Sequence, residues 1–252
     1  MPTWLQAGLW GLLGGGALVL GALVAWFVRV PQVVIASVMA FGSGVLISAV
    51  AFDLMTEAAD TGGLVPTAVG FVGGALAYLG ANVLLARRGA KHRKRSGSNP
   101  EENQPSEEES QGSGTAIAIG ALLDGIPESA AIGVSLVEGG AVGAAVVAAV
   151  FISNVPEALS ASAGMKTAGR STGFILGLWA AVTVASALAA AAGFAFLASA
   201  PVLAVAVVLA FAAGAMLTMT ADTMLPEAVD HAGPLVGVVA ALGFTVAFLI
   251  SS

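Results

Sequence analysis

Three carboxylates lie inside otherwise apolar stretches of this chain. Asp124 and Glu128 are the first and last residues of the segment Asp-Gly-Ile-Pro-Glu, and Glu157 is the last residue of the similar segment Ser-Asn-Val-Pro-Glu. In a helix, Asp124 and Glu128 lie one turn apart on one face, and Ser153 and Asn154 share the face of Glu157. A charge near the centre of a bilayer costs about 2.5–3.5 kcal/mol, and neither stretch contains Lys or Arg. We therefore expect a bound cation, a proton or water to offset the cost of burying these acids.

A proline precedes the final glutamate of each segment. Pro127 and Pro156 lack the backbone N–H, so each should kink its helix and free the carbonyl four residues earlier, at Leu123 or Ile152. Free carbonyls at membrane depth are tolerated where they line a polar cavity. Hard oxygen donors of this kind suit divalent cations. The candidate metal ligands are Asp124, Glu128, Ser153, Asn154 and Glu157. The alternative is a pair of kinked packing helices with protonated acids, which leaves the repeated motif unexplained.

The composition excludes most other classes of protein. Of 252 residues, 58% are hydrophobic and 10% are charged, whereas about a quarter of a soluble domain is charged. A single soluble domain and a disordered chain are therefore excluded. The absence of cysteine excludes disulfides and thiolate metal sites, and the net charge of −6 argues against a nucleic-acid partner. Strand-like alternation is missing, which argues against a membrane β-barrel.

We predict an all-α polytopic protein with eight transmembrane helices in a lipid bilayer. Each helix needs about 20 mostly apolar residues, and the expected spans are 4–28, 32–57, 64–86, 114–137, 140–164, 171–199, 201–227 and 233–251. With these spans, every Lys and Arg falls on one side, which the positive-inside rule makes the cytoplasm. Both termini are then extracytoplasmic, and the expected location is the cell (plasma) membrane.

The predicted organisation has four parts. Residues 1–86 form helices one to three, residues 114–164 form helices four and five with the metal site, and residues 165–252 form helices six to eight. Residues 87–113 are a polar cytoplasmic segment that runs from basic to acidic. Such a composition buries too little apolar area to order itself, so we expect a disordered, solvated loop.

A second duplication connects spans two and seven. The residues from Phe41 to Ala58 and those from Phe211 to Ala228 share a pattern of glycine and apolar residues at an offset of 170. The spans run in opposite directions, which is typical of an inverted repeat arranged 3+2+3 around a central site. Acids at each mouth would concentrate cations, although each alone could be an ordinary interfacial residue. The expected pathway entrance is Asp53 and Glu57, and the expected exit is Asp222, Glu227 and His231.

These motifs resemble those of the ZIP (Zrt-/Irt-like protein) family of metal transporters. The resemblance rests on the paired Pro-Glu motifs and the Pro-Glu-Ala of span seven, and it extends over nearly the whole chain. It implies a divalent-metal pathway between spans four and five, elevator-type movement and a homodimer. The family usually has His-Asn-x-Pro-Glu in these spans, whereas Asp124, Gly125 and Ser153 stand at three of those positions here, and span six has no acid. The resemblance therefore implies a divalent cation (Zn, Mn, Fe, Cd or Mg) as substrate, without selecting zinc.

The leading hypothesis is a divalent-metal transporter that has no organic cofactor and is not an enzyme. The alternative is a proton-coupled transporter of a non-metal solute, in which the acids form a proton relay. An intramembrane hydrolase would need a Ser-His pair, a catalytic Asp pair or a zinc His-Glu motif, and none is present. A scaffold or sensor would have no reason to bury acids in a membrane.

Overall fold

The fold is known from a computed structural model of the chain. Its described part consists of residues 2–90, 92–94, 104–106, 108–110, 112–138 and 141–251, with the backbone alone at 138 and 141–143. Within those ranges the secondary structure is helical and contains no β-strand. The predicted all-α class is therefore confirmed. The predicted loop at 87–113 falls partly on residues 91, 95–103, 107 and 111, which lie outside the described residues.

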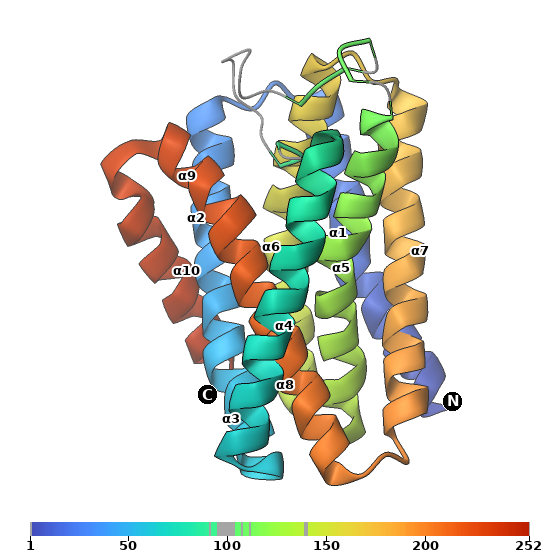
Figure 1. Cartoon of the computed structure of the whole chain (residues 1–252). Helices are drawn as coiled ribbons and strands as arrows, with labels where there is room; N and C mark the ends of the chain where they lie inside the picture. The colour runs from blue at the N-terminus through green and yellow to red at the C-terminus, as the bar shows by residue number, and fades with distance from the viewer. Residues whose placement is uncertain are drawn as a thin grey trace.

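The helices form one bundle (Figure 1). The N-terminal half comprises α1 (Thr3–Phe27), α2 (Gln32–Ser48), the π-helix η1 (Ala49–Leu54), α3 (Met55–Gly62), α4 (Leu64–Leu85) and the π-helical turn η2 (Ala86–Ala90). The C-terminal half comprises α5 (Ser113–Glu138), α6 (Ala141–Thr167), α7 (Thr172–Leu197), α8 (Val202–Met219), the π-helix η4 (Thr220–Met224), α9 (Leu225–Ala232), the 3-10 turn η5 (Gly233–Leu235) and α10 (Val236–Ser251).

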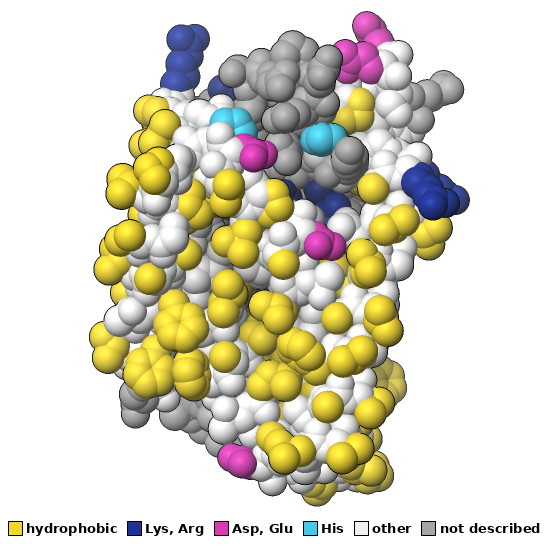
Figure 2. All heavy atoms as spheres, turned by 60° about the vertical axis from the view of Figure 1, so that its left-hand side comes forward, with side chains coloured by type: hydrophobic (Ala, Val, Ile, Leu, Met, Phe, Trp, Pro, Cys, Tyr) yellow, Lys and Arg dark blue, Asp and Glu magenta, His cyan; other side chains and the backbone are white. Residues whose placement is uncertain are grey.

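The bundle is a multi-pass membrane protein by length and composition. Among the residues that the structure describes, seven helical stretches are long and apolar enough to cross a bilayer: Thr3–Phe27, Gln32–Gly62, Leu64–Ala90, Ser113–Val137, Ala144–Thr167, Thr172–Leu197 and Val202–Ser251. Large apolar side chains such as Phe27, Leu64 and Phe196 are about four-fifths exposed, as expected for a surface that faces lipid. Figure 2 shows such side chains over most of one face, while Lys, Arg and His lie toward one end. The last stretch contains both spans predicted at 201–227 and 233–251.

The two duplicated regions have the same local structure. A π-helix interrupts each long helix at the equivalent position, η1 after α2 and η4 after α8. Each short helix that follows then ends at a glycine with a positive φ, 81° at Gly63 and 66° at Gly233. Glycine tolerates that backbone region without a steric cost. The sequence duplication therefore corresponds to a duplicated helix–π-helix–helix–turn unit.

The helix contacts are reciprocal between the two halves. α2 packs against α10 while α8 packs against α4, and α1 packs against α6 while α7 packs against α5. α1 and α7 also contact each other. Glycines bring these helices together: a Cβ on Gly44 would overlap the backbone of α10, and a Cβ on Gly74 would overlap the backbone of α8. In lipid, close packing of this kind holds helices together, because there is no hydrophobic drive for them to pair.

Candidate functional site

The predicted ligands lie together in the interior, on α5 and α6. Asp124 and Glu128 come from α5, and Ser153, Asn154 and Glu157 come from α6. All five side chains are at most 3% exposed. Pro127 and Pro156 lie inside these two continuous helices. Helices four and five of the prediction therefore do bury their polar residues within the bundle.

Asp124 is held by a guanidinium from the segment after α4. Arg93 Nε lies 2.9 Å from Asp124 Oδ2, and Arg93 Nη2 lies 2.8 Å from Oδ1. This is a two-pronged, charge-assisted pair. The Tyr78 hydroxyl on α4 donates to Asp124 and accepts from Arg93 Nη2 at 2.8 Å. Arg93 Nη1 also donates to Asn82 Oδ1 at 2.7 Å, so two α4 side chains one turn apart hold the guanidinium.

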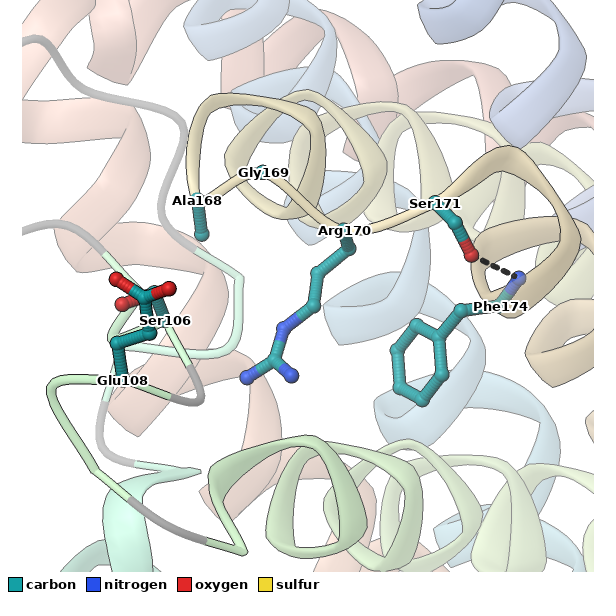
Figure 3. Close-up of a pocket in the computed structure, with 7 residues that line it drawn as sticks. All are labelled: Ser106, Glu108, Ala168, Gly169, Arg170, Ser171 and Phe174. Carbon is teal, nitrogen blue, oxygen red and sulfur yellow. Dashed lines mark hydrogen bonds between the residues drawn. The ribbon is translucent and has the colours of Figure 1, made fainter.

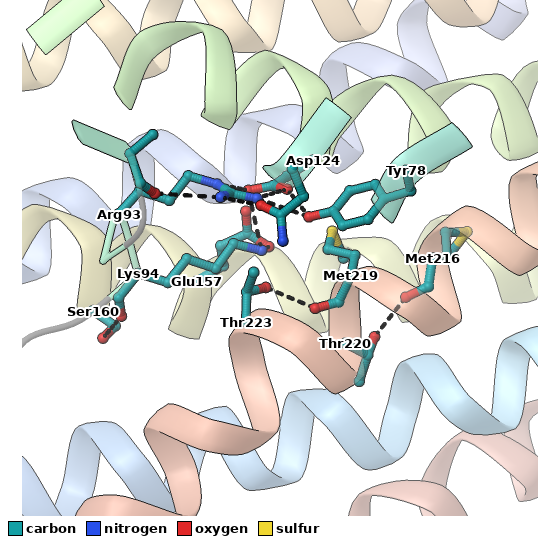
Figure 4. Close-up of polar contacts among 12 residues, drawn as sticks. Tyr78, Arg93, Lys94, Asp124, Glu157, Ser160, Met216, Met219, Thr220 and Thr223 are labelled. Atoms are coloured by element: carbon teal, nitrogen blue, oxygen red, sulfur yellow. Dashed lines mark hydrogen bonds and ion pairs between the residues drawn. The ribbon is translucent and has the colours of Figure 1, made fainter. Parts of the chain in front are cut away.

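Lys94 connects the two helices that carry the acids. Its ammonium nitrogen lies 3.3 Å from Asp124 Oδ2 on α5 and 3.0 Å from Glu157 Oε2 on α6. Figure 4 shows Arg93 and Lys94 reaching among Tyr78, Asp124 and Glu157. A cationic group thus already lies between carboxylates of the two motif helices.

This arrangement corrects one premise of the sequence analysis. The premise that no ammonium or guanidinium accompanies the buried acids is wrong, because Arg93 and Lys94 are each 3% exposed and paired with them. The expectation of a solvated segment also does not hold at these two residues or at Gln104, which is buried too. Buried charges need partners, and the nearest basic run along the chain supplies them. Burial alone would lower the pKa of Arg93, but attraction to Asp124 outweighs burial and raises that pKa, so the guanidinium stays charged.

Glu128 and Asn154 form the second part of the site. Asn154 Nδ2 donates to the carbonyl of Gly14 on α1 at 3.0 Å, and the Asn154 side chain lies beside the carboxylate of Glu128. Glu128 lies close enough to Glu157 for the two carboxylates to interact electrostatically. Glu128 Oε1 and Asn154 Oδ1 are buried acceptors without a hydrogen-bond donor in the described part of the chain. Ser153 instead donates to Val150 O in its own helix at 3.0 Å, as suits a wall residue.

Little space remains around the ion pairs. A cavity of about 10 Å³ lies among Arg93, Lys94, Asp124 and Glu157, which is at the lower limit for a single water molecule. Among the described residues, no three His, Cys, Asp or Glu side chains are arranged as a metal-binding group. Both oxygens of Asp124 are already bound by Arg93, Lys94 and Tyr78.

The predicted entrance acids lie on η1 and α3, outside the two helices that carry the predicted ligands. Asp53, in η1, is 7% exposed and accepts a hydrogen bond from Ser251 Oγ at 3.1 Å. Glu57, in α3, is half-buried. Figure 1 places α3 at the end of the bundle opposite to α9. The two acidic ends of the duplication therefore lie at opposite ends of the molecule, as the inverted arrangement predicts.

The predicted exit residues adjoin the Arg93–Lys94 segment. Asp222 lines a polar cavity of about 200 Å³ together with Asn82, His92, Arg93 and Lys94. Glu227 is 1% exposed, and its Oε1 lies 3.2 Å from Ser160 Oγ on α6. The Ser160 hydroxyl also donates to Lys94 O at 2.7 Å, and His231 Nδ1 lies 3.9 Å from Glu227 Oε2. These acids are thus connected to the buried site through the same segment.

A roomier cavity lies elsewhere and offers less chemistry. About 510 Å³ in volume, it lies between Ser106 and Glu108 on one side and the turn that joins α6 to α7 on the other (Figure 3). Its basic residue, Arg170, donates to Pro105 O and Ser113 Oγ, and Glu108 lines the same cavity. The larger volume of this cavity therefore does not by itself make it a candidate functional site.

Sequence reasoning missed the residues that come from outside the two motifs: Tyr78, Asn82, Arg93, Lys94 and Ser160. One signal was present for the first two. Tyr78 is the single tyrosine of the chain, and Asn82 follows it by one helical turn in an apolar span. No local sequence pattern predicts that the side chains of Arg93 and Lys94 are buried, because their partners lie about 30 to 60 residues further along the chain. No protein-family model matches this chain, and no curated protein matches its sequence.

Proposed function

We propose that this protein transports divalent metal cations and binds them between α5 and α6. The observation that carries the proposal is the position of Lys94, whose ammonium bridges Asp124 and Glu157 from the two motif helices. A place that stabilises one cation between two carboxylates is also a place for another cation. In this proposal the metal takes the position of the ammonium.

The remaining donors support a divalent ion over a monovalent one. Glu128 Oε1 and Asn154 Oδ1 are buried oxygens that find no donor among the described residues. Together with Asp124 and Glu157 they offer four oxygen-bearing side chains, and oxygen shells suit Mg²⁺, Ca²⁺ and Mn²⁺. We propose that the substrate belongs to the class Zn, Mn, Fe, Cd or Mg, and that the oxygen donors favour Mn²⁺ and Mg²⁺ within this class.

The proposed pathway follows the inverted repeat. We infer that Val202–Ser251 crosses the membrane twice, since Gly233 interrupts it and its two parts pack on different helices, α8 on α4 and α10 on α2. That gives eight passes with both termini outside the cell membrane and the segment 87–113 in the cytoplasm. Metal then enters past Asp53 and Glu57 and leaves past Asp222, Glu227 and His231. A ZIP-like architecture, and a homodimer with it, are parts of this proposal.

Uptake into proteoliposomes tests the function. Purified protein should carry Mn²⁺ into vesicles. Glu128→Gln and Glu157→Gln should each abolish the flux, because each replaces a negatively charged ligand of the ion with a neutral amide. The matched control is Asp60→Asn, which neutralises an exposed acid in α3 and should transport normally. If the vesicles take up no metal but acidify when an organic solute is offered, the buried acids act as a proton relay and the metal proposal is wrong.

A further inference from the structure

We propose that Arg93 and Lys94 are a built-in counter-charge that closes the metal site, and that metal binding releases this segment. The inference rests on the proposed function and describes how that same site is regulated. It is carried by the contacts that the two cations make with two carboxylates, Asp124 and Glu157.

Competition for the same oxygens is the first step. Arg93 and Lys94 together contact both oxygens of Asp124, and Lys94 contacts Glu157. About 10 Å³ of space remains beside them, too little for a metal ion and the water that accompanies it. A divalent cation therefore cannot bind Asp124 and Glu157 until Lys94 has left.

The charge of Arg93 and Lys94 together equals that of one divalent metal ion. The two cations neutralise two of the three buried acids, Asp124, Glu128 and Glu157, and one divalent ion carries the same charge. Exchange of the segment for the ion thus leaves the net charge of the interior unchanged. Leaving the acids bare would cost much more, because unpaired buried charges are strongly unfavourable.

The segment is fastened by contacts that can be undone. Apart from the ion pairs, it is held by hydrogen bonds: Arg93 to Asn82 and Tyr78, Ser160 to the carbonyl of Lys94, and Gln104 to the carbonyls of Arg93 and Ala161. Arg93 also lies against Gly120 of α5, where a Cβ would collide with its Cδ. The polar cavity of about 200 Å³ beside His92 and Asp222 adjoins the segment, so the cations have a polar route outward.

Reciprocity gives the proposal a measurable sign. If metal and segment exclude each other, the closed segment lowers metal affinity by the same factor by which bound metal loosens the segment. A substitution that weakens the segment should therefore tighten metal binding. Couplings between sites in proteins typically amount to about 5–150-fold. A purely structural role of the ion pairs predicts the opposite, since removal of a structural cation would leave a damaged site that binds metal no better.

The first experiment measures Mn²⁺ affinity of the full-length purified protein. Lys94→Gln should raise the affinity by about 5–150-fold, and Gly120→Ala, which displaces Arg93 and keeps its charge, should raise it too. Arg88→Gln is the matched control, because Arg88 is an exposed basic residue of the preceding turn, and its affinity should equal that of the wild type. Unchanged or weaker affinity in folded Lys94→Gln and Gly120→Ala overturns the proposal.

A second experiment leaves the ion pairs intact. The chain has no cysteine, so His92→Cys introduces a single thiol next to Arg93, and Thr167→Cys introduces one at the exposed last residue of α6. Mn²⁺ should accelerate maleimide labelling at position 92 and leave labelling at 167 unchanged. If Mn²⁺ binds without accelerating labelling at 92, the release mechanism is wrong while the metal site stands. If Mn²⁺ does not raise the temperature of thermal unfolding of the protein, no metal binds and the proposed function itself fails.

Discussion

The pair between Arg93 and Asp124 can be measured with a double-mutant cycle of Arg93→Gln and Asp124→Asn. Both side chains are almost fully buried, at 3% and 1% exposure, and two N···O distances of 2.8 and 2.9 Å connect them. Removing one partner of a buried pair typically costs about 3–5 kcal/mol, because the other charge is left uncompensated. Lys94 and Tyr78 remain on Asp124 in Arg93→Gln, so we expect this variant to fall near the lower end, about 3 kcal/mol. Asp124→Asn takes a carboxylate from both Arg93 and Lys94 and should fall near the upper end, about 5 kcal/mol.

The coupling is the informative quantity. Because the two residues touch, the double variant should be destabilised by less than the sum of the single variants, with a difference of about 1–3 kcal/mol. Equilibrium unfolding in mixed detergent micelles, followed by the fluorescence of the four tryptophans, gives the free energies of unfolding of the wild type, the two single variants and the double variant. The matched pair Arg88→Gln and Asp60→Asn, both at exposed positions, should change stability by no more than about 0.5 kcal/mol each. If the effects at Arg93 and Asp124 simply add within about 0.5 kcal/mol, the guanidinium does not hold this carboxylate and the reasoning fails.

Three further predictions test the packing, the hydroxyl and the polar segment. Gly74→Ala should destabilise the protein by about 1–3 kcal/mol in thermal unfolding, because a Cβ at Gly74 meets the backbone of α8. Gly80→Ala is the control, since a Cβ there has open space and should not destabilise the protein. Equal effects of the two substitutions would contradict the close crossing of α4 and α8. Tyr78→Phe should cost about 1.5–3 kcal/mol, because it removes the hydroxyl shared by the guanidinium and the buried carboxylate; wild-type stability would rule that contact out. The backbone N–H and hydroxyl of Ser106 lower the pKa of Glu109, so Ser106→Ala should raise that pKa part of the way to its ordinary value, and this turn should loosen as pH falls through the pKa in an NMR titration.

The sequence predicts the membrane helices well because their signal is local. An apolar run of about 20 residues has few alternatives to a spanning helix, and the expected starts at 4, 32, 64, 114, 140, 171 and 201 lie within a few residues of those observed. Span two was expected as one helix over 32–57. The structure instead divides it into α2, η1 and α3, and apolar patterning does not distinguish a π-helical turn from an α-helical one.

The residues of the candidate site also divide into those that the sequence identifies and those that it does not. Asp124, Glu128, Asn154 and Glu157 are identifiable because burying such side chains in an apolar helix is costly and so demands an explanation. Arg93 and Lys94 are not, because a basic run beside a span has the composition of a solvated loop. Their burial depends on tertiary contacts with Tyr78 and the two motif helices, which no helical period encodes.

The proposed metal site between α5 and α6 is tested most directly by an anomalous-scattering map from crystals of the full chain soaked with Mn²⁺. The account predicts a manganese peak between α5 and α6, coordinated by Glu128 and Glu157, with Lys94 withdrawn from the carboxylates. A map without manganese between these helices, in crystals that hold the ion elsewhere on the protein, would contradict it.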